Sequence, residues 1–211
     1  MRYFNNLPLL EVVFDEFDSG LTFVSLVNKP AIKTNFLSFT DEDICKFSIQ
    51  DPDKRLVSGL AMIPNLPIYR KLPTGEEFYV QFSADTIRKL AEKFFNEQRT
   101  LAVNVEHELP VSDVVIIESY FIDKERGIAP VEFPDVENGA WYVTMKVNND
   151  ELWNEIKVGN LNGFSVEGLF DVSQMFTNNE QPELPELPPI EEIKEPTYKS
   201  VYDIIADTIF K

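Results

Sequence analysis

The stretch LAVNVEHELPVSDVVIIESYFI, residues 101–122, contains two apolar runs separated by a short polar turn. In the first run apolar and polar residues alternate, which predicts a strand near residues 101–107 that carries Leu101, Val103, Val105 and His107 on one face. The second run predicts another strand over residues 113–122. Because the turn is short enough for a hairpin, we expect the two strands to be neighbours.

Other parts of the chain repeat this pattern, with helices placed between the strands. Two segments have helical spacing of apolar residues: residues 83–98, capped by Ser83 or Asp85, and residues 149–160, capped by Asn149 or Asp150. The chain is therefore predicted to be α+β. Further strands are expected near residues 8–15, 20–27, 56–63, 77–82, 140–147 and 163–171.

The composition changes near residue 178, which divides the chain into three parts. Residues 1–177 are predicted to form the core domain. Residues 178–198 hold five prolines and six glutamates, so they are expected to form an extended, disordered linker. Residues 199–211 resume helical spacing and predict an amphipathic C-terminal helix that docks on a partner or on the core domain.

Charge and composition exclude several classes of protein. The formal net charge of -17 argues against nucleic-acid binding, which needs clustered Lys and Arg. One cysteine and one histidine cannot build an ordinary structural zinc site or a disulfide framework, so no metal is expected. We find no signal-peptide pattern and no run long enough to span a membrane. These features predict a cytosolic protein without a membrane partner.

Ser165 is the first residue that suggests chemistry, because it lies between Gly163 and Gly168 in a predicted strand. Glycines near a serine let the backbone approach a substrate and leave N–H groups free to face an oxyanion. Position 167 is Glu, so this is not the nucleophile elbow of α/β-hydrolases. The alternative is a structural serine beside a bulge glycine.

His107 is the only histidine, and hence the only imidazole that could act as a general base near neutral pH. The alternative is a structural histidine at the end of a strand. For a third catalytic member the sequence favours Glu118, a carboxylate on an apolar strand face, over Glu167 and Asp171 in the serine's own strand. A solvent-facing edge charge is the alternative for Glu118.

Several segments, in the same order, resemble the prohead (capsid-maturation) serine proteases of tailed phages, and specifically the XkdF-like branch found in PBSX-like prophages. The resemblance covers roughly residues 8–173. It rests on EHE at 106–108, ES at 118–119, GFSVEGLF around Ser165, GLTFVSLVNKPAI at 20–32 and RLVSGLAMIPNLPIYR at 55–70.

The resemblance implies an architecture similar to herpesvirus assemblin: a β-barrel-like core with flanking helices and a serine–histidine pair, here Ser165 and His107. Assemblins use a second histidine as third member, and this chain has none, so a carboxylate would take that role or the role would be absent. In other prohead proteases a segment like VSLVNKPAI follows the serine strand. Here it precedes the histidine, which suggests a circularly permuted strand order.

The implied function is cleavage of scaffold and major capsid protein segments inside the immature capsid in the host cytoplasm, with autocleavage and without a cofactor. A homodimer is left open. One alternative is a non-catalytic head-assembly or scaffold protein that retains the protease fold. Another is an unrelated acidic β-rich adaptor, in which Ser165 and His107 would lie far apart.

Overall fold

Most of the alternating apolar runs form strands in the computed structural model, which describes residues 2–17, 19–28, 46–72 and 74–170. All of these residues belong to one compact unit. The strands are β1 (Arg2–Phe4), β2 (Leu7–Val12), β3 (Gly20–Val27), β4 (Ser48–Asp51), β5 (Leu56–Met62), β6 (Ile68–Lys71), β7 (Glu77–Phe82), β8 (Val103–Val105), β9 (Leu109–Pro110), β10 (Val114–Phe121), β11 (Trp141–Val147) and β12 (Gly163–Leu169).

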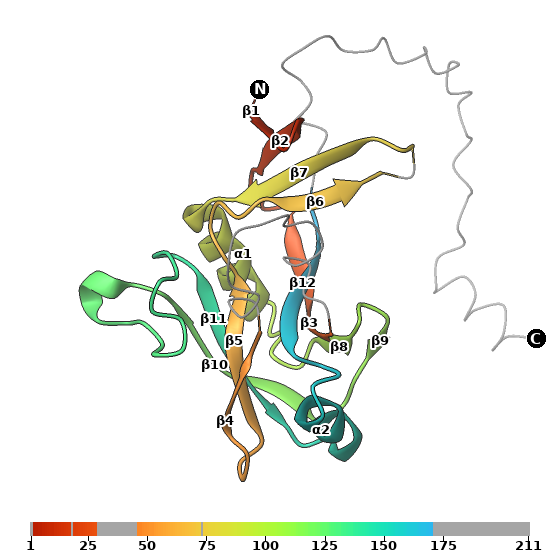
Figure 1. The fold of residues 1–211 in the computed structure, drawn as a ribbon, viewed down its shortest axis with the longest axis vertical. Coiled ribbons are helices and arrows are strands. Elements are labelled where there is room, and N and C mark those ends of the chain that lie inside the picture. Colours follow the sequence, from red (N-terminus) through yellow and green to blue (C-terminus); the bar gives the residue numbers. More distant parts are fainter. Residues whose placement is uncertain (1, 18, 29–45, 73, 171–211) are drawn as a thin grey trace, which may run out of the picture. The chain divides into compact units, whose positions relative to one another are not determined.

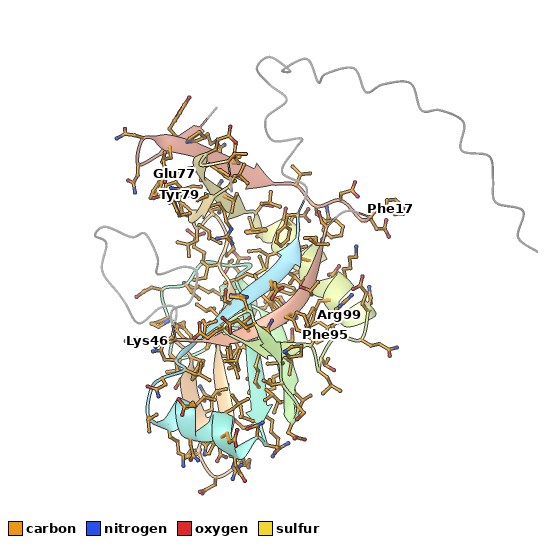
Figure 2. All side chains as sticks on the ribbon, turned by 90° about the vertical axis from the view of Figure 1, so that its right-hand side faces the viewer. Phe17, Lys46, Glu77, Tyr79, Phe95 and Arg99 are labelled. Atoms are coloured by element: carbon orange, nitrogen blue, oxygen red, sulfur yellow. The ribbon has the colours of Figure 1, made fainter. Side chains whose placement is uncertain are left out.

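The strands form three four-stranded sheets (Figure 1). Their strand orders are β1-β2-β7-β6, β10-β11-β5-β4 and β12-β3-β8-β9. In the third sheet β12 is an end strand, antiparallel to β3, and β3 is parallel to β8. Figures 1 and 2 both show β12 and β3 side by side.

Among the described residues, two α-helices and one 3-10 helix connect the strands: α1 (Ala84–Asn96), α2 (Asp150–Lys157) and η2 (Lys124–Arg126). The Ser83 side chain caps α1 by accepting a hydrogen bond from the Thr86 backbone N–H at 3.2 Å. The Asn149 side chain caps α2 by accepting one from the Leu152 N–H at 3.0 Å. The predicted helices are thus confirmed, and in each case the first of the two proposed caps is the one used.

One core joins the three sheets and both α-helices. Phe94 of α1 and Trp141 of β11 are fully buried, with ring centroids 5.9 Å apart. Phe95, labelled in Figure 2, stacks edge-on against the same tryptophan. Burial of side chains this large supplies much of the stability of a domain of this size, which fixes the sheets against one another.

The α+β class is confirmed, but the barrel-like core is not: each sheet of the described residues has two end strands, so none closes on itself. The predicted linker and C-terminal helix lie outside the described residues, so the three-part division of the chain remains a prediction. No helix among the described residues is long and apolar enough to cross a membrane.

The predicted hairpin between the His107 strand and the Glu118 strand is wrong. β8 pairs with β3 and with the short β9, whereas β10 pairs with β11 in a different sheet. The residues after β8 turn back along it before the chain crosses to β10, so sequence proximity does not make the two strands neighbours.

Candidate active site

Three polar side chains lie on one face of the β12-β3-β8-β9 sheet. Ser165 of β12 pairs directly with Ser25 of β3, which in turn pairs with Asn104 of β8. Because paired residues of neighbouring strands point to the same face, the three side chains are neighbours across the sheet. All are buried: Ser165 is 5% exposed, Ser25 0% and Asn104 2%.

His107 lies above this face because the chain turns sharply where β8 ends. Glu106 and His107 both adopt left-handed backbone angles, with φ of 52° and 61°. This conformation costs a non-glycine residue on the order of 1 kcal/mol, so neighbouring contacts must hold it. The Glu106 N–H donates to the Leu26 carbonyl at 3.1 Å, and the Asn28 N–H donates to Glu106 Oε1 at 2.6 Å.

This turn also corrects the predicted strand face. The strand ends at Val105, and the imidazole contacts the face that carries Ser25 and Asn104, opposite to Val103 and Val105. Simple alternation therefore fails at His107, because the left-handed turn redirects its side chain.

The imidazole of His107 bridges two serine hydroxyls. Its Nε2 lies 3.1 Å from Ser165 Oγ, and its Nδ1 lies 2.9 Å from Ser25 Oγ. When Nδ1 carries the ring proton, it donates a hydrogen bond to Ser25 Oγ. Nε2 is then unprotonated and can accept the proton of Ser165 Oγ. This is the arrangement that an imidazole needs to act as general base toward a serine nucleophile.

A carboxylate lies on the Nδ1 side of the same ring. Glu167 Oε2 is 3.6 Å from His107 Nδ1, and the side chains of both residues are about 40% exposed (41% and 38%). Asn104 Nδ2 donates a hydrogen bond to the same Glu167 oxygen at 2.9 Å. Asn104 Oδ1 is buried and has no hydrogen-bond partner in the described part of the chain. The amide therefore holds Glu167 where its charge can stabilise an imidazolium.

The family model described as "Putative phage serine protease XkdF" matches residues 43–174, which is more than half of the chain. This chain belongs to the XkdF family. The resemblance seen in the sequence is therefore confirmed. The matched range includes Asn104, His107, Ser165 and Glu167 but not Ser25.

One relative is the phage-like element PBSX protein XkdF of Bacillus subtilis (strain 168), 29% identical over 169 residues. The match covers 74% of this chain and 54% of that protein, so the chain spans about half the length of this XkdF relative. No solved structure matches the chain.

The structure brings together two of the three residues that the sequence favoured in this XkdF-family chain. Ser165 and His107 are in contact, whereas Glu118 is exposed on β10, in another sheet. A β-bulge between Ile116 and Glu118 turns these two side chains to opposite faces, so Glu118 does not share the apolar face that alternation predicted. Glu167, a proposed alternative, is the carboxylate beside His107. Asp171, the other alternative, lies outside the described residues.

Sequence reasoning missed Ser25 and Asn104. Each is a polar residue inside an apolar strand, in VSLV at 24–27 and in AVNV at 102–105. A polar residue at a buried strand position needs a partner, and that signal could have been used for both. It would not have indicated which partner, because β3 and β8 are distant in sequence from Ser165.

A small pocket opens beside the serine, between β12 and the segment that runs from β5 to β6. Apart from Ser165 and Arg70, every residue that lines it is apolar. The pocket lies at β12, an end strand whose outer edge forms a bridge between Gly163 and Lys46 and otherwise carries backbone N–H and C=O groups that β3 does not use. Among the described residues there is no group of three or more His, Cys, Asp or Glu side chains that could hold a metal ion.

Proposed function

We propose that this chain is a serine endopeptidase in which Ser165 is the nucleophile and His107 the general base. The observation that carries the proposal is the 3.1 Å contact between Ser165 Oγ and His107 Nε2, within the range expected of a nucleophile and its base. Membership of a family described as phage serine proteases supports it. The proposal depends on the contact between Ser165 and His107, and it does not require the closed β-barrel of an assemblin-like fold.

In the proposed mechanism His107 Nε2 takes the proton from Ser165 Oγ while Oγ attacks the carbonyl carbon of the scissile peptide. Backbone N–H groups of the β12 edge would stabilise the oxyanion. His107 then gives its proton to the leaving amine as the C–N bond breaks. Water, deprotonated by His107, hydrolyses the acyl ester, which releases the carboxylic acid and regenerates the serine.

For the third member we propose Glu167 in place of Glu118. Its carboxylate faces Nδ1 and would favour both the Nδ1–H tautomer and the imidazolium that forms during attack. Ser25 would be a second, neutral partner of Nδ1. No cofactor takes part in this mechanism.

The proposed substrates are segments of the phage scaffold and major capsid protein, cleaved inside the immature capsid in the host cytoplasm. This follows from the resemblance to prohead proteases. We propose autocleavage within residues 178–198, because this Pro- and Glu-rich segment is predicted to be extended and proteases cut extended, exposed segments.

The test is processing of co-expressed scaffold and capsid protein by the parent chain, Ser165→Ala and His107→Ala. Both variants should abolish processing while remaining folded, and the losses should be non-additive because the pair acts as a unit. Full processing by either variant would overturn the assignment of Ser165 and His107, whereas a parent chain that processes neither protein would favour the non-catalytic head-assembly protein.

A further inference from the structure

Arg70 brings a positive charge to the pocket beside the nucleophile. It lies on β6, and the pocket that it lines also includes Ser165, Phe164 and Phe170. Since every other lining residue is uncharged, a bound group would meet apolar walls and a single guanidinium.

Within the part of the chain that the structure describes, this guanidinium has no carboxylate partner. Its Nη1 donates to the carbonyl of the adjacent residue, Tyr69, at 2.9 Å. The next residue, Lys71, pairs with Glu77 at 2.9 Å, and Arg55 pairs with Asp150 at 2.6 Å. Acidic residues outnumber basic ones 36 to 19 in this chain, yet no described carboxylate pairs with Arg70. The charge of Arg70 is therefore available to an anionic group of a ligand.

The guanidinium of Arg70 is suited to bind a carboxylate. Arg70 is exposed to solvent, and the atoms that surround its guanidinium lower its pKa from the ordinary value. Arg stays protonated at neutral pH even so, and a hydrogen bond between two charged groups is stronger than one between neutral groups. Its planar donors match the two oxygens of a carboxylate.

We propose that this pocket binds the substrate residue that flanks the scissile bond and that Arg70 makes the site selective for Glu or Asp there. This inference rests on the proposed function and adds the class of substrate. The carboxylate of either residue would pair with Arg70, and its methylene groups would meet the apolar lining of the pocket. The chain's own linker, residues 178–198, holds six glutamates and so offers such sequences for autocleavage.

The experiment is cleavage-site profiling of a mixed peptide pool by mass spectrometry, with the full-length parent, Arg70→Gln and Arg88→Gln. Arg88 is the matched control, since it lies on α1 over the Phe121 ring and does not line the pocket. The parent should cleave next to Glu or Asp at least about tenfold more often than next to Gln or Asn. Arg70→Gln should lose this preference, and Arg88→Gln should keep it. Equal preference in the parent and Arg70→Gln, or no acidic preference in the parent, overturns the inference.

Labelling with a small fluorophosphonate separates this inference from the proposed function. The reagent reacts with an activated serine without a peptide side chain, so the parent and Arg70→Gln should label equally and Ser165→Ala should not. Equal labelling of the first two also shows that Arg70→Gln is folded. If the parent is labelled but shows no preference for Glu or Asp, only the proposed role of Arg70 is wrong. If the parent is neither labelled nor able to cleave peptides, the proposed protease function and this inference are both wrong.

Discussion

At the scale of single residues, the site depends on which groups meet the two ring nitrogens of His107. Nε2 meets the proposed nucleophile, and Nδ1 meets both a buried hydroxyl and a half-exposed carboxylate. A hydroxyl can donate or accept, so Ser25 alone permits either tautomer. A carboxylate only accepts, so Glu167 favours the tautomer that leaves Nε2 free to act as base.

The role of Glu167 is tested with Glu167→Gln. The amide keeps the size of the side chain and removes the charge that would stabilise the imidazolium, so kcat/KM on a peptide substrate should fall at least about tenfold. Glu118→Gln is the control and should be as active as the parent, because Glu118 is exposed in another sheet. The opposite result, an inactive Glu118→Gln and an active Glu167→Gln, would restore the first expectation.

Ser25 is tested with Ser25→Ala. Loss of one neutral hydrogen bond to Nδ1 amounts to about 1 kcal/mol, so kcat/KM should fall roughly fivefold while activity remains measurable. Ser58→Ala is a matched control, because Ser58 is also a fully buried strand serine, bonded to Thr144 at 2.9 Å away from the site. It should lose stability without loss of activity. Equal activity losses in both variants would mean that Ser25 is merely structural.

At the scale of elements, the turn after β8 decides where the imidazole goes. Two consecutive left-handed residues carry His107 back over the sheet, and Glu106 ties this turn to the residue after β3 through the Asn28 N–H. The anchor thus joins the histidine's turn to the strand that pairs with the serine's strand.

Removal of this anchor should reduce activity more than stability. Glu106→Ala leaves the Asn28 N–H without its acceptor, so we expect His107 to shift and kcat/KM to fall about tenfold or more. Glu106→Gln should recover most of the activity, since an amide oxygen also accepts. A Glu106→Ala variant with the kcat/KM of the parent would show that the turn holds itself without this bond.

The cap of α1 is a test of the fold away from the site. Ser83→Ala removes the acceptor of the Thr86 N–H and should lower the free energy of unfolding by about 1 kcal/mol in urea denaturation. Ser112→Ala is the control, because the Ser112 hydroxyl bonds only an exposed neighbour, Asp113. If both variants are as stable as the parent, the cap does not stabilise α1 measurably.

At the scale of the whole molecule, the described residues form a core that joins three sheets and two α-helices. Its largest side chains, among them Trp141 and Phe94, are fully buried, and these two rings contact each other. We therefore predict that the core domain folds independently of residues 178–211.

Truncation after residue 177 tests this. The midpoint of thermal unfolding should stay within a few degrees of the parent, since the apolar surface buried in the core is retained. Incorporation of the truncated chain into proheads should fail, if the amphipathic segment binds a scaffold or capsid partner. A clear loss of thermal stability would instead show that the tail docks on its own core domain.

The sequence by itself determined the α+β class, both α-helices and most of the strands, and it narrowed each helix cap to two residues. These follow from local periodicity and capping residues, which need no knowledge of distant contacts. Ser165 and His107 were proposed from the flanking glycines, the single histidine and the family resemblance. Only the tertiary structure decided which carboxylate lies beside the histidine and that Ser25 and Asn104 join it. A bulge turns Glu118 away, and a left-handed turn redirects His107. Strand pairing then brings residues 25, 104 and 165 side by side. Neither bulges, nor such turns, nor the order of strands in a sheet can be read from alternation, because each depends on which distant segment supplies the partner hydrogen bonds.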